Sequence, residues 1–225
     1  MSESLAPETT LWRYMDFTRF VSLFLDQSLF FCRVDQLDDP FEGNITRIEY
    51  EYLMNKEEPE WEDYRNTLSE LYKLTRETVY VNCWHSDSRE SAAMWSLYSG
   101  QYDGVAIKTD FQSLKTSIEI EHLVLYDKIS YRDYNKFPYE HEIAPPYLSK
   151  QIEFEHEKEV RAYKHGDYPD VKGIPVPVDI GVLVKEVVVA PYAKGWFVDL
   201  VESIVHTSKS KATVSKSQLA NAPDF

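Results

Sequence analysis

Short apolar runs of the strand type lie towards both ends of this 225-residue chain, and helix-type patterns lie between them. Strands and helices do not alternate regularly, and the sequence has no internal repeat and no linker-like stretch. Regular alternation is typical of a parallel α/β sheet, whereas segregated elements are typical of an α+β domain. We therefore predict one α+β domain over residues 11–216, with a flexible leader at 1–10, a helical insertion at about 45–78 and a tail at 217–225.

Hydrophobic periodicity locates the elements of this domain. Phe17, Phe20 and Phe24 follow helical spacing, and Asp16 stands in the N-cap position before them. In "HSDSRESAAMWSLY", Asp87 and Glu90 have the spacing of a capping box at the start of another helix. The remaining predictions are helices at 17–27, 59–77 and 192–205, strands at 11–15, 29–34, 79–84, 104–109, 120–131, 156–164, 185–190 and 211–215, and an edge strand at 174–178.

Charge and hydropathy restrict the partners. The formal net charge is −14, and an acidic surface repels phosphate backbones, so bulk nucleic-acid binding is disfavoured. The amino-terminal residues are polar and lack the apolar core of a signal peptide, and no apolar run reaches the length of a membrane span. We expect a cytoplasmic protein with no membrane partner and no structural metal.

The stretch "FEHEKEVRAY" carries charged residues at every second position. If it is a strand, Glu155, Glu157, Glu159 and Arg161 all point to one face. Neighbouring carboxylates repel one another unless a cation or ligand lies between them, so such a face is unfavourable without a partner. Two alternatives stay open: a solvent-facing strand, and a surface helix, because no residue between Gln151 and Lys164 breaks a helix.

Two further segments carry candidate binding residues. Arg13 lies between Trp12 and Tyr14 in a short apolar strand, where a guanidinium needs a carboxylate or a phosphate as partner. The segment after Trp84 joins a strand to a helix N-terminus, which suits an anion, and it contains His85 and Ser91. A structural ion pair for Arg13, and a core role for Trp95 and Tyr98 on that helix, are the alternatives.

A metal site is another alternative. Asp38, Asp39 and Glu42 in "DDPFEG" are oxygen ligands of the kind that divalent cations prefer. A proline-containing turn with capping carboxylates explains the same residues without a metal. No glycine-rich phosphate loop is present in the sequence.

Taken in order, "LWRYMDF", "LFFCRVDQLDDPFEGN", "VNCWHSDSRESAAMWSLYS", "GVAIKT" and "FEHEKEVRAY" resemble a bacterial family known as domain of unknown function 2971. The resemblance runs from about residue 11 to 190. The CW…MW…Y and E-x-E-V-R segments are its specific parts. The family name implies a fold neighbourhood rather than an activity.

The same order of segments is similar to the ADP-ribosyltransferase plan, which implies two small mixed or antiparallel sheets around an NAD cleft with helices packed outside. That resemblance assigns Glu159 and Glu157 as catalytic carboxylates, with the choice among Glu155, Glu157 and Glu159 open. This sequence departs from the plan because it lacks a Ser-Thr-Ser middle segment and has a long spacing before the glutamates. NAD as substrate is the implied cofactor, held by Arg13, Tyr14, Trp84, His85, Ser91, Trp95, Tyr98 and Arg161.

Three function classes follow. The first is an NAD-consuming ADP-ribosyltransferase or glycohydrolase, acting as a bacterial toxin or phage-defence effector on an unidentified acceptor macromolecule, with a small nucleotide as its ligand. The second is a metal-dependent phosphodiesterase or nuclease using Asp38, Asp39, Glu157 and Glu159. The third is a non-catalytic protein-binding module that uses tyrosines and prolines of 126–147; it predicts that Glu157 and Glu159 are exposed.

Overall fold

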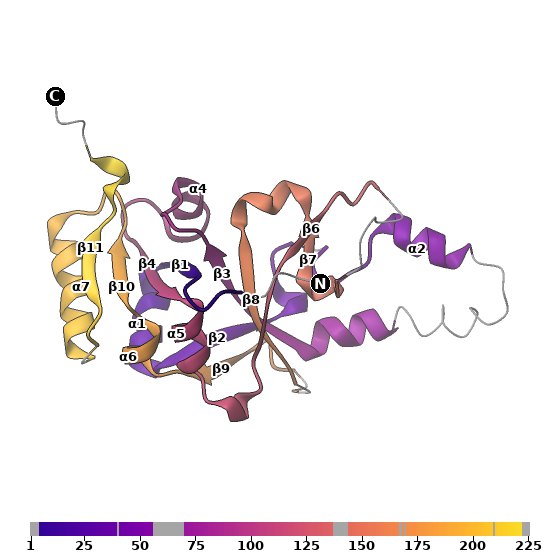
Figure 1. Ribbon diagram of the computed structural model, residues 1–225, viewed down its shortest axis with the longest axis horizontal. Helices are drawn as coiled ribbons and strands as arrows, with labels where there is room; N and C mark the ends of the chain where they lie inside the picture. The colour runs from indigo at the N-terminus through magenta and orange to yellow at the C-terminus, as the bar shows by residue number, and fades with distance from the viewer. Residues whose placement is uncertain are drawn as a thin grey trace. The chain divides into compact units, whose positions relative to one another are not determined.

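The structure is a computed structural model, and it describes residues 5–39, 41–55, 70–136, 144–166, 168, 170–208 and 210–221. It contains both helices and a mixed set of strands, which confirms the predicted α+β class (Figure 1). The chain forms two compact units, each assembled from separate stretches of sequence. The first unit contains Met1–Leu29, Cys83–Leu123 and Pro175–Phe225, and the second contains Phe30–Asn82 and Val124–Ile174.

The sheet of the first unit has the strand order β11-β10-β4-β1-β3. Its members are β1 (Thr10–Asp16), β3 (Val79–Ser86), β4 (Gly104–Asp110), β10 (Glu186–Val189) and β11 (Thr213–Lys216). The pairing is antiparallel except between β10 and β11, which run parallel. Only the second half of β3, from Cys83 onward, belongs to this unit.

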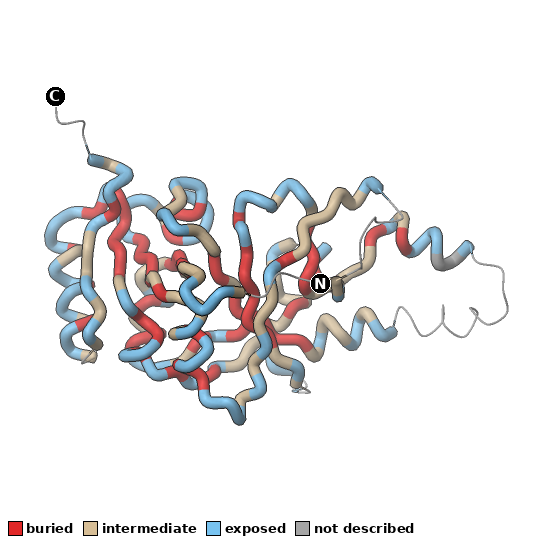
Figure 2. Tube along the Cα trace, in the orientation of Figure 1, coloured by how far each residue is buried: buried red, intermediate tan, exposed pale blue. Residues whose placement is uncertain are grey.

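Apolar side chains of this sheet form the core of the first unit. Val105, Ala106 and Ile107 of β4 are fully buried, as are Val187 and Val189 of β10, and Figure 2 shows both strands as buried. Helices cover the sheet, with α7 packed against β11. They are α1 (Phe17–Asp26), α4 (Ala92–Met94), α5 (Phe111–Thr116), α6 (Ile180–Leu183) and α7 (Gly195–Thr207), with a π-helix, η2, at Trp95–Ser99.

The periodicity of α1 is confirmed. Its N-cap is Asp16, whose carboxylate accepts a hydrogen bond from the Arg19 N–H at 2.8 Å. Phe20, Leu23 and Phe24 are its buried residues. An amphipathic helix with a satisfied first turn therefore forms where the sequence predicts it.

Both ends of the predicted domain are fixed further out than expected. In the segment predicted as a leader, the carbonyls of Pro7 and Thr9 accept hydrogen bonds from the N–H groups of Gln112 and Phe111. In the segment predicted as a tail, Gln218–Ala220 forms a 3-10 helix, η6. Backbone hydrogen bonds, which composition does not reveal, hold these segments.

The second unit pairs β2 (Ser28–Arg33) with the first half of β3, with Cys32 opposite Val81. Strand β9 (Gly173–Pro177) pairs with β2 at the end of the strand order, so it is an edge strand, as its prolines predict. Strand β8 (Glu159–His165) pairs with β3 and, antiparallel, with β5 (Leu125–Lys128). A separate parallel pair joins β6 (Ser130–Arg132) to β7 (Ser149–Gln151).

Helical residues of the second unit correspond in part to the predicted insertion. Helix α2 (Arg47–Met54) begins with a capping box between Thr46 and Glu49. Residues 70–78 are also helical, whereas the start of the predicted 59–77 helix, including Pro59, lies outside the described residues. Short 3-10 helices are η1 (Val34–Gln36), η3 (Ile120–His122), η4 (Pro146–Leu148) and η5 (Ile152–Glu157).

Two strand predictions need correction. The segment 120–131 is not one strand, because η3 occupies its first residues. The acidic strand begins at Glu159 rather than at 156, since η5 ends at Glu157 and Lys158 takes a left-handed conformation with φ 42°. Glu155 and Glu157 therefore do not lie on a strand face with Glu159 and Arg161.

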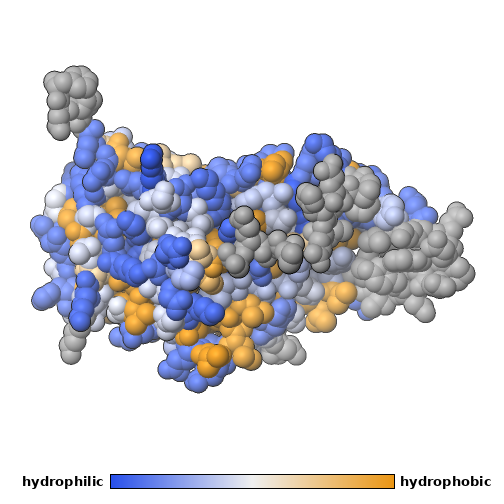
Figure 3. All heavy atoms as spheres, viewed as in Figure 1, coloured by the Kyte–Doolittle hydropathy of each residue, from blue (hydrophilic) through white to orange (hydrophobic). Residues whose placement is uncertain are grey.

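The surface shown in Figure 3 is largely hydrophilic, with scattered apolar side chains. Among the described residues, the most exposed large apolar side chains are Ile120, at 91%, and Leu25 and Leu123, at 75% each. Among the described residues, no helix combines the length and the apolar character needed to cross a membrane.

Candidate functional site

A buried ionic network in the second unit contains three of the predicted site residues. Strand β8 places Glu159 and Arg161 on one face, and Arg161 Nε donates to Glu159 Oε1 at 2.7 Å. Arg161 Nη2 donates to Glu42 Oε2 at 2.7 Å, and Nη1 donates to the carbonyl of Tyr147 at 2.7 Å. The Arg161 side chain is 0% exposed, and its guanidinium binds these internal partners.

Lys150 of β7 is the second cation of this network. Its Nζ lies 2.6 Å from Glu157 Oε2, 3.0 Å from Glu159 Oε2 and 3.2 Å from Glu42 Oε1. Among the residues that the structure describes, three carboxylates therefore face two cations. We call Glu42, Lys150, Glu157, Glu159 and Arg161 the buried ion network.

The backbone of the network is also fixed. The Glu159 N–H donates to the Tyr131 hydroxyl at 2.8 Å, and the Glu159 carbonyl accepts from the Ile129 N–H at 2.9 Å. Burial raises the pKa of Tyr131, so its hydroxyl stays protonated at neutral pH. Glu157 and Glu159 are each 5% exposed, which contradicts the exposed placement that a binding module predicts.

The network contains two residues, Glu42 and Lys150, whose role in it no local sequence pattern indicates. Glu42 was predicted as an acidic turn residue with a metal as the alternative, and it accepts from Arg161, 119 residues further along the chain. Lys150 was not predicted at all, since an isolated lysine before an acidic stretch carries no recognisable motif. Among the described residues, no group of three or more His, Cys, Asp or Glu side chains is arranged to hold a metal ion.

A second cluster, in the first unit, gathers the other predicted site residues around β1 and β3. Arg13 Nη1 donates to the Cys83 carbonyl at 2.8 Å, and its guanidinium carbon lies 5.9 Å from the centre of the Trp84 ring. This geometry is a cation–π contact, which holds a half-buried guanidinium in place. We call Arg13, Tyr14, Trp84, His85, Ser91, Trp95 and Tyr98 the aromatic cluster.

Tyr14 connects the two strands of this cluster to the following helix. Its hydroxyl accepts from the Ser91 N–H at 2.8 Å, and its ring lies edge-on to Trp95 at 5.1 Å and to His85 at 6.1 Å. Burial raises the pKa of Tyr14, and the nearby charges of Glu90 and Asp87 act in the same direction. The hydroxyl is therefore neutral at physiological pH.

The helix start differs from the predicted capping box. The N-cap is Ser91, whose side chain accepts from the Met94 N–H at 3.4 Å, and α4 begins one residue later. Glu90 instead accepts from Trp95 Nε1 at 3.0 Å, from Ser217 Oγ at 2.6 Å and from the Gln218 N–H at 3.1 Å. The Glu90 carboxylate therefore binds three donors, two of them far along the chain, instead of the single backbone N–H that a capping box would satisfy.

Accessibility divides the aromatic cluster into two groups. Tyr14, Trp84, His85 and Trp95 are buried. Arg13 and Ser91 are half-buried and Tyr98 is 42% exposed, so these three can touch a ligand. The indole N–H of Trp84 is buried and has no hydrogen-bond partner among the described residues, which is an unfavourable state that a ligand oxygen would relieve.

Comparison with known proteins gives one family and three structures. The family described as "Protein of unknown function (DUF2971)" matches residues 94–162, which confirms over that range the resemblance predicted from the sequence. No curated protein matches the sequence.

The similar solved structures are all of DarT from Thermus sp. 2.9. The complex with NAD+ is 9% identical with a TM-score of 0.46, and 97% of this chain and 100% of that chain are covered. The complex with ADP-ribosylated ssDNA is 10% identical with a TM-score of 0.44 and coverage of 99% and 100%. The complex with carba-NAD+ is 9% identical with a TM-score of 0.42 and coverage of 96% and 100%.

Proposed function

We propose that this protein is an NAD-consuming enzyme, which breaks the bond between nicotinamide and ribose and passes ADP-ribose to an acceptor or to water. The observation that carries the proposal is the Arg13 guanidinium, held 5.9 Å from the centre of the Trp84 ring, whose buried indole N–H has no hydrogen-bond partner among the described residues. These groups suit a dinucleotide, which offers phosphate oxygens, sugar hydroxyls and flat rings.

The proposal gives each accessible residue a role in binding. Arg13 supplies positive charge to the pyrophosphate, and its contact with Trp84 fixes the guanidinium before the ligand arrives. Tyr98 offers an exposed ring for stacking, and Ser91 offers a hydroxyl. The buried residues Tyr14, His85 and Trp95 position this set rather than touch NAD.

The proposal assigns the chemical step to Glu159, with Glu157 as the assisting carboxylate. As the nicotinamide leaves with the bonding electron pair, positive charge develops on the ribose, and a carboxylate stabilises it. The two carboxylates lie together in the buried ion network, where both contact Lys150, and this proximity supports the assignment. Both oxygens of Glu159 contact cations in the structure, so the carboxylate must exchange one partner to contact a ribose.

Release of nicotinamide from NAD tests this function. Glu159→Gln keeps the shape and one acceptor oxygen, and we expect turnover to fall by about 100-fold or more, the order seen when a charge-stabilising group is lost. Arg13→Gln is expected to weaken NAD binding by about 10-fold, as for a lost charged hydrogen bond.

Glu155→Gln is the matched control. Glu155 lies four residues before Glu159 in the same acidic stretch, but its side chain is exposed. Its substitution should leave turnover unchanged. Equal turnover in Glu159→Gln and wild type, with folding of both verified by thermal unfolding, would remove the assignment of the acidic residue. Absence of nicotinamide release and of NAD binding by the wild type would remove the function.

A further inference from the structure

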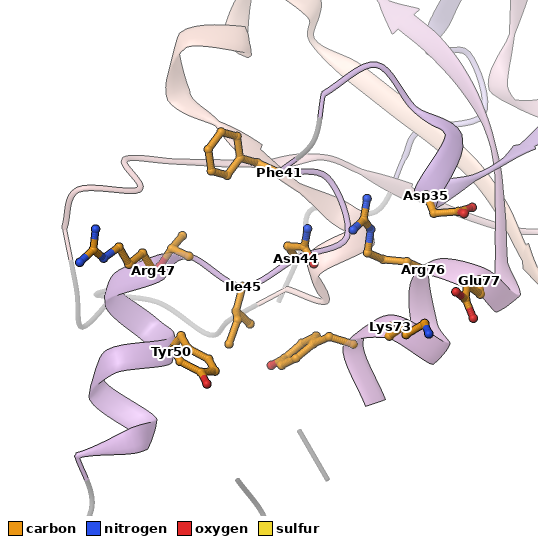
Figure 4. A pocket seen from close by; sticks show the side chains of 11 residues that line it. Asp35, Phe41, Asn44, Ile45, Arg47, Tyr50, Lys73, Arg76 and Glu77 are labelled. Atoms are coloured by element: carbon orange, nitrogen blue, oxygen red, sulfur yellow. The ribbon is translucent and has the colours of Figure 1, made fainter. Parts of the chain in front are cut away.

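The second unit contains a pocket of about 520 Å³ between α2 and the helical residues 70–78 (Figure 4). None of its lining residues belongs to the buried ion network or to the aromatic cluster. A volume of this size accommodates a small organic ligand such as a mononucleotide. The pocket is lined by Asp35, Phe41, Asn44, Ile45, Thr46, Arg47, Tyr50, Tyr72, Lys73, Arg76 and Glu77.

Two guanidinium groups act on one carboxylate at one end of this pocket. Arg33 binds Asp35 through two hydrogen bonds, from Nε at 2.6 Å and from Nη2 at 3.0 Å, and Gln36 donates to the same carboxylate at 2.8 Å. Asp35 is therefore already matched by one guanidinium. Arg76 brings a second guanidinium close enough to interact electrostatically with Asp35. Two cations share one carboxylate in a chain whose net charge is −14.

The Arg76 side chain is held in position without a complete set of acceptors. Its aliphatic stem packs against Gly43, because a Cβ added at that glycine would lie 2.7 Å from Arg76 Cγ. Its Nε is buried and has no hydrogen-bond partner among the described residues. Figure 4 shows the side chain extending from the helical residues 70–78 toward Asn44. A buried guanidinium nitrogen without an acceptor indicates that an anion is the missing partner.

Aromatic rings line the same pocket as this cation. Tyr50 comes from α2 and is 45% exposed, Tyr72 comes from the facing helical residues, and Phe41 comes from the connecting turn. Aromatic rings and a guanidinium that line one pocket suit a ligand that has a planar ring and an anionic group on one molecule.

We propose that this pocket binds a nucleoside monophosphate, with the phosphate on Arg76 and the base against the tyrosine rings. The proposal does not depend on NAD turnover, because it involves neither Arg13 nor Glu159.

Binding of AMP to the full chain, measured by calorimetry, tests the proposal. We expect AMP to bind with a Kd below about 1 mM. Arg76→Gln should weaken binding at least 10-fold, Arg76→Lys less, and Tyr50→Leu several-fold, since Tyr50 is an exposed position whose change does not disturb the core. Arg19→Gln is the matched control, an exposed arginine on α1 whose side chain is 72% exposed, and it should bind as the wild type does.

Three comparisons separate the elements of the site. Adenosine and inorganic phosphate should each bind more weakly than AMP, because each lacks half of the recognised chemistry. Inorganic phosphate binding as tightly as AMP would overturn the role of the rings. AMP binding that is lost in Arg13→Gln but retained in Arg76→Gln would place the nucleotide in the aromatic cluster and overturn the proposal, as would no AMP binding by the wild type.

Discussion

Arg161 and Glu159, two residues apart on β8, are joined by a 2.7 Å hydrogen bond from the guanidinium Nε to the carboxylate Oε1, with both side chains buried. Side chains two apart on a strand point to the same face. Glu159 also has a second cationic partner, because Lys150 contacts its other oxygen at 3.0 Å. A buried charge in such an arrangement is stable only while its partners remain.

Arg161→Leu should therefore be strongly destabilising. It leaves Glu42 and Glu159 buried with one cation fewer, and breaking a buried pair in this way costs about 3–5 kcal/mol. We expect the Tm to fall by about 10 °C in thermal unfolding, given the usual relation for a chain of this length. Arg19→Leu, at an exposed ion pair, should change the Tm by no more than a degree or two, and a similar fall in both variants would argue against the special role of the network.

Glu90→Gln should loosen the carboxyl-terminal segment. The glutamine can still accept through one oxygen, but it cannot accept from Trp95, Ser217 and Gln218 as the carboxylate does. Loss of charged hydrogen bonds of this kind costs about 1–3 kcal/mol. Hydrogen exchange at the Gln218 amide should become faster while amides of β4 keep their protection. Unchanged exchange at Gln218 would show that Glu90 does not hold this segment.

Tyr14→Phe should alter stability in a way that depends on pH. At pH 7 it removes the acceptor of the Ser91 N–H, which we expect to cost about 1 kcal/mol. Burial raises the pKa of Tyr14, so its hydroxyl remains protonated in the folded state where the unfolded chain ionises. The stability that protonated Tyr14 gives to the folded state is complete below pH 10, the usual tyrosine pKa. It is lost as the pH rises above that value.

The loss of Tm between pH 9 and pH 11 should therefore be smaller in Tyr14→Phe than in the wild type. Tyr102→Phe is the control, because Tyr102 is 70% exposed. An identical alkaline decline in Tyr14→Phe and wild type would mean that Tyr14 does not contribute to it.

Gly43→Ala should destabilise the second unit and weaken AMP binding together. Gly43 has φ +74°, and an added Cβ would lie 2.5 Å from Val34 Cγ1 and 2.7 Å from Arg76 Cγ. The backbone strain lowers the stability of the unit, and the displacement of Arg76 weakens the binding of AMP. We expect a loss of about 1–3 kcal/mol in urea unfolding. Gly195→Ala is a suitable control, since nothing lies within 4 Å of its added Cβ.

Local sequence patterns were sufficient to predict helix α1, the edge strand β9 and the common face of Glu159 and Arg161. The same pattern failed to predict the backbone at Lys158, the residue directly before Glu159. A lysine with φ 42° is uncommon, and nothing in "EHEKEV" indicates that the alternation stops there. Glu155 and Glu157 consequently lie on a 3-10 helix rather than on the strand.

The candidate sites depended more on long-range contacts. The residue types that surround Arg13 and Ser91 were predictable, because a short strand and a helix N-terminus mark them. The partners Glu42 and Lys150 were not, since their roles arise only when distant segments meet around Arg161. Glu90 shows the same limit, because a local capping pattern and a distant set of donors compete for one carboxylate.

The chain leaves one compact unit and enters the other after Leu29, Asn82, Leu123 and Ile174. No single truncation can therefore isolate either unit, and a fragment ending inside β3 would lack parts of both. Efforts to divide the protein for separate expression should instead use co-expressed pieces, and the first unit has all of its strands only after β11 has been synthesised.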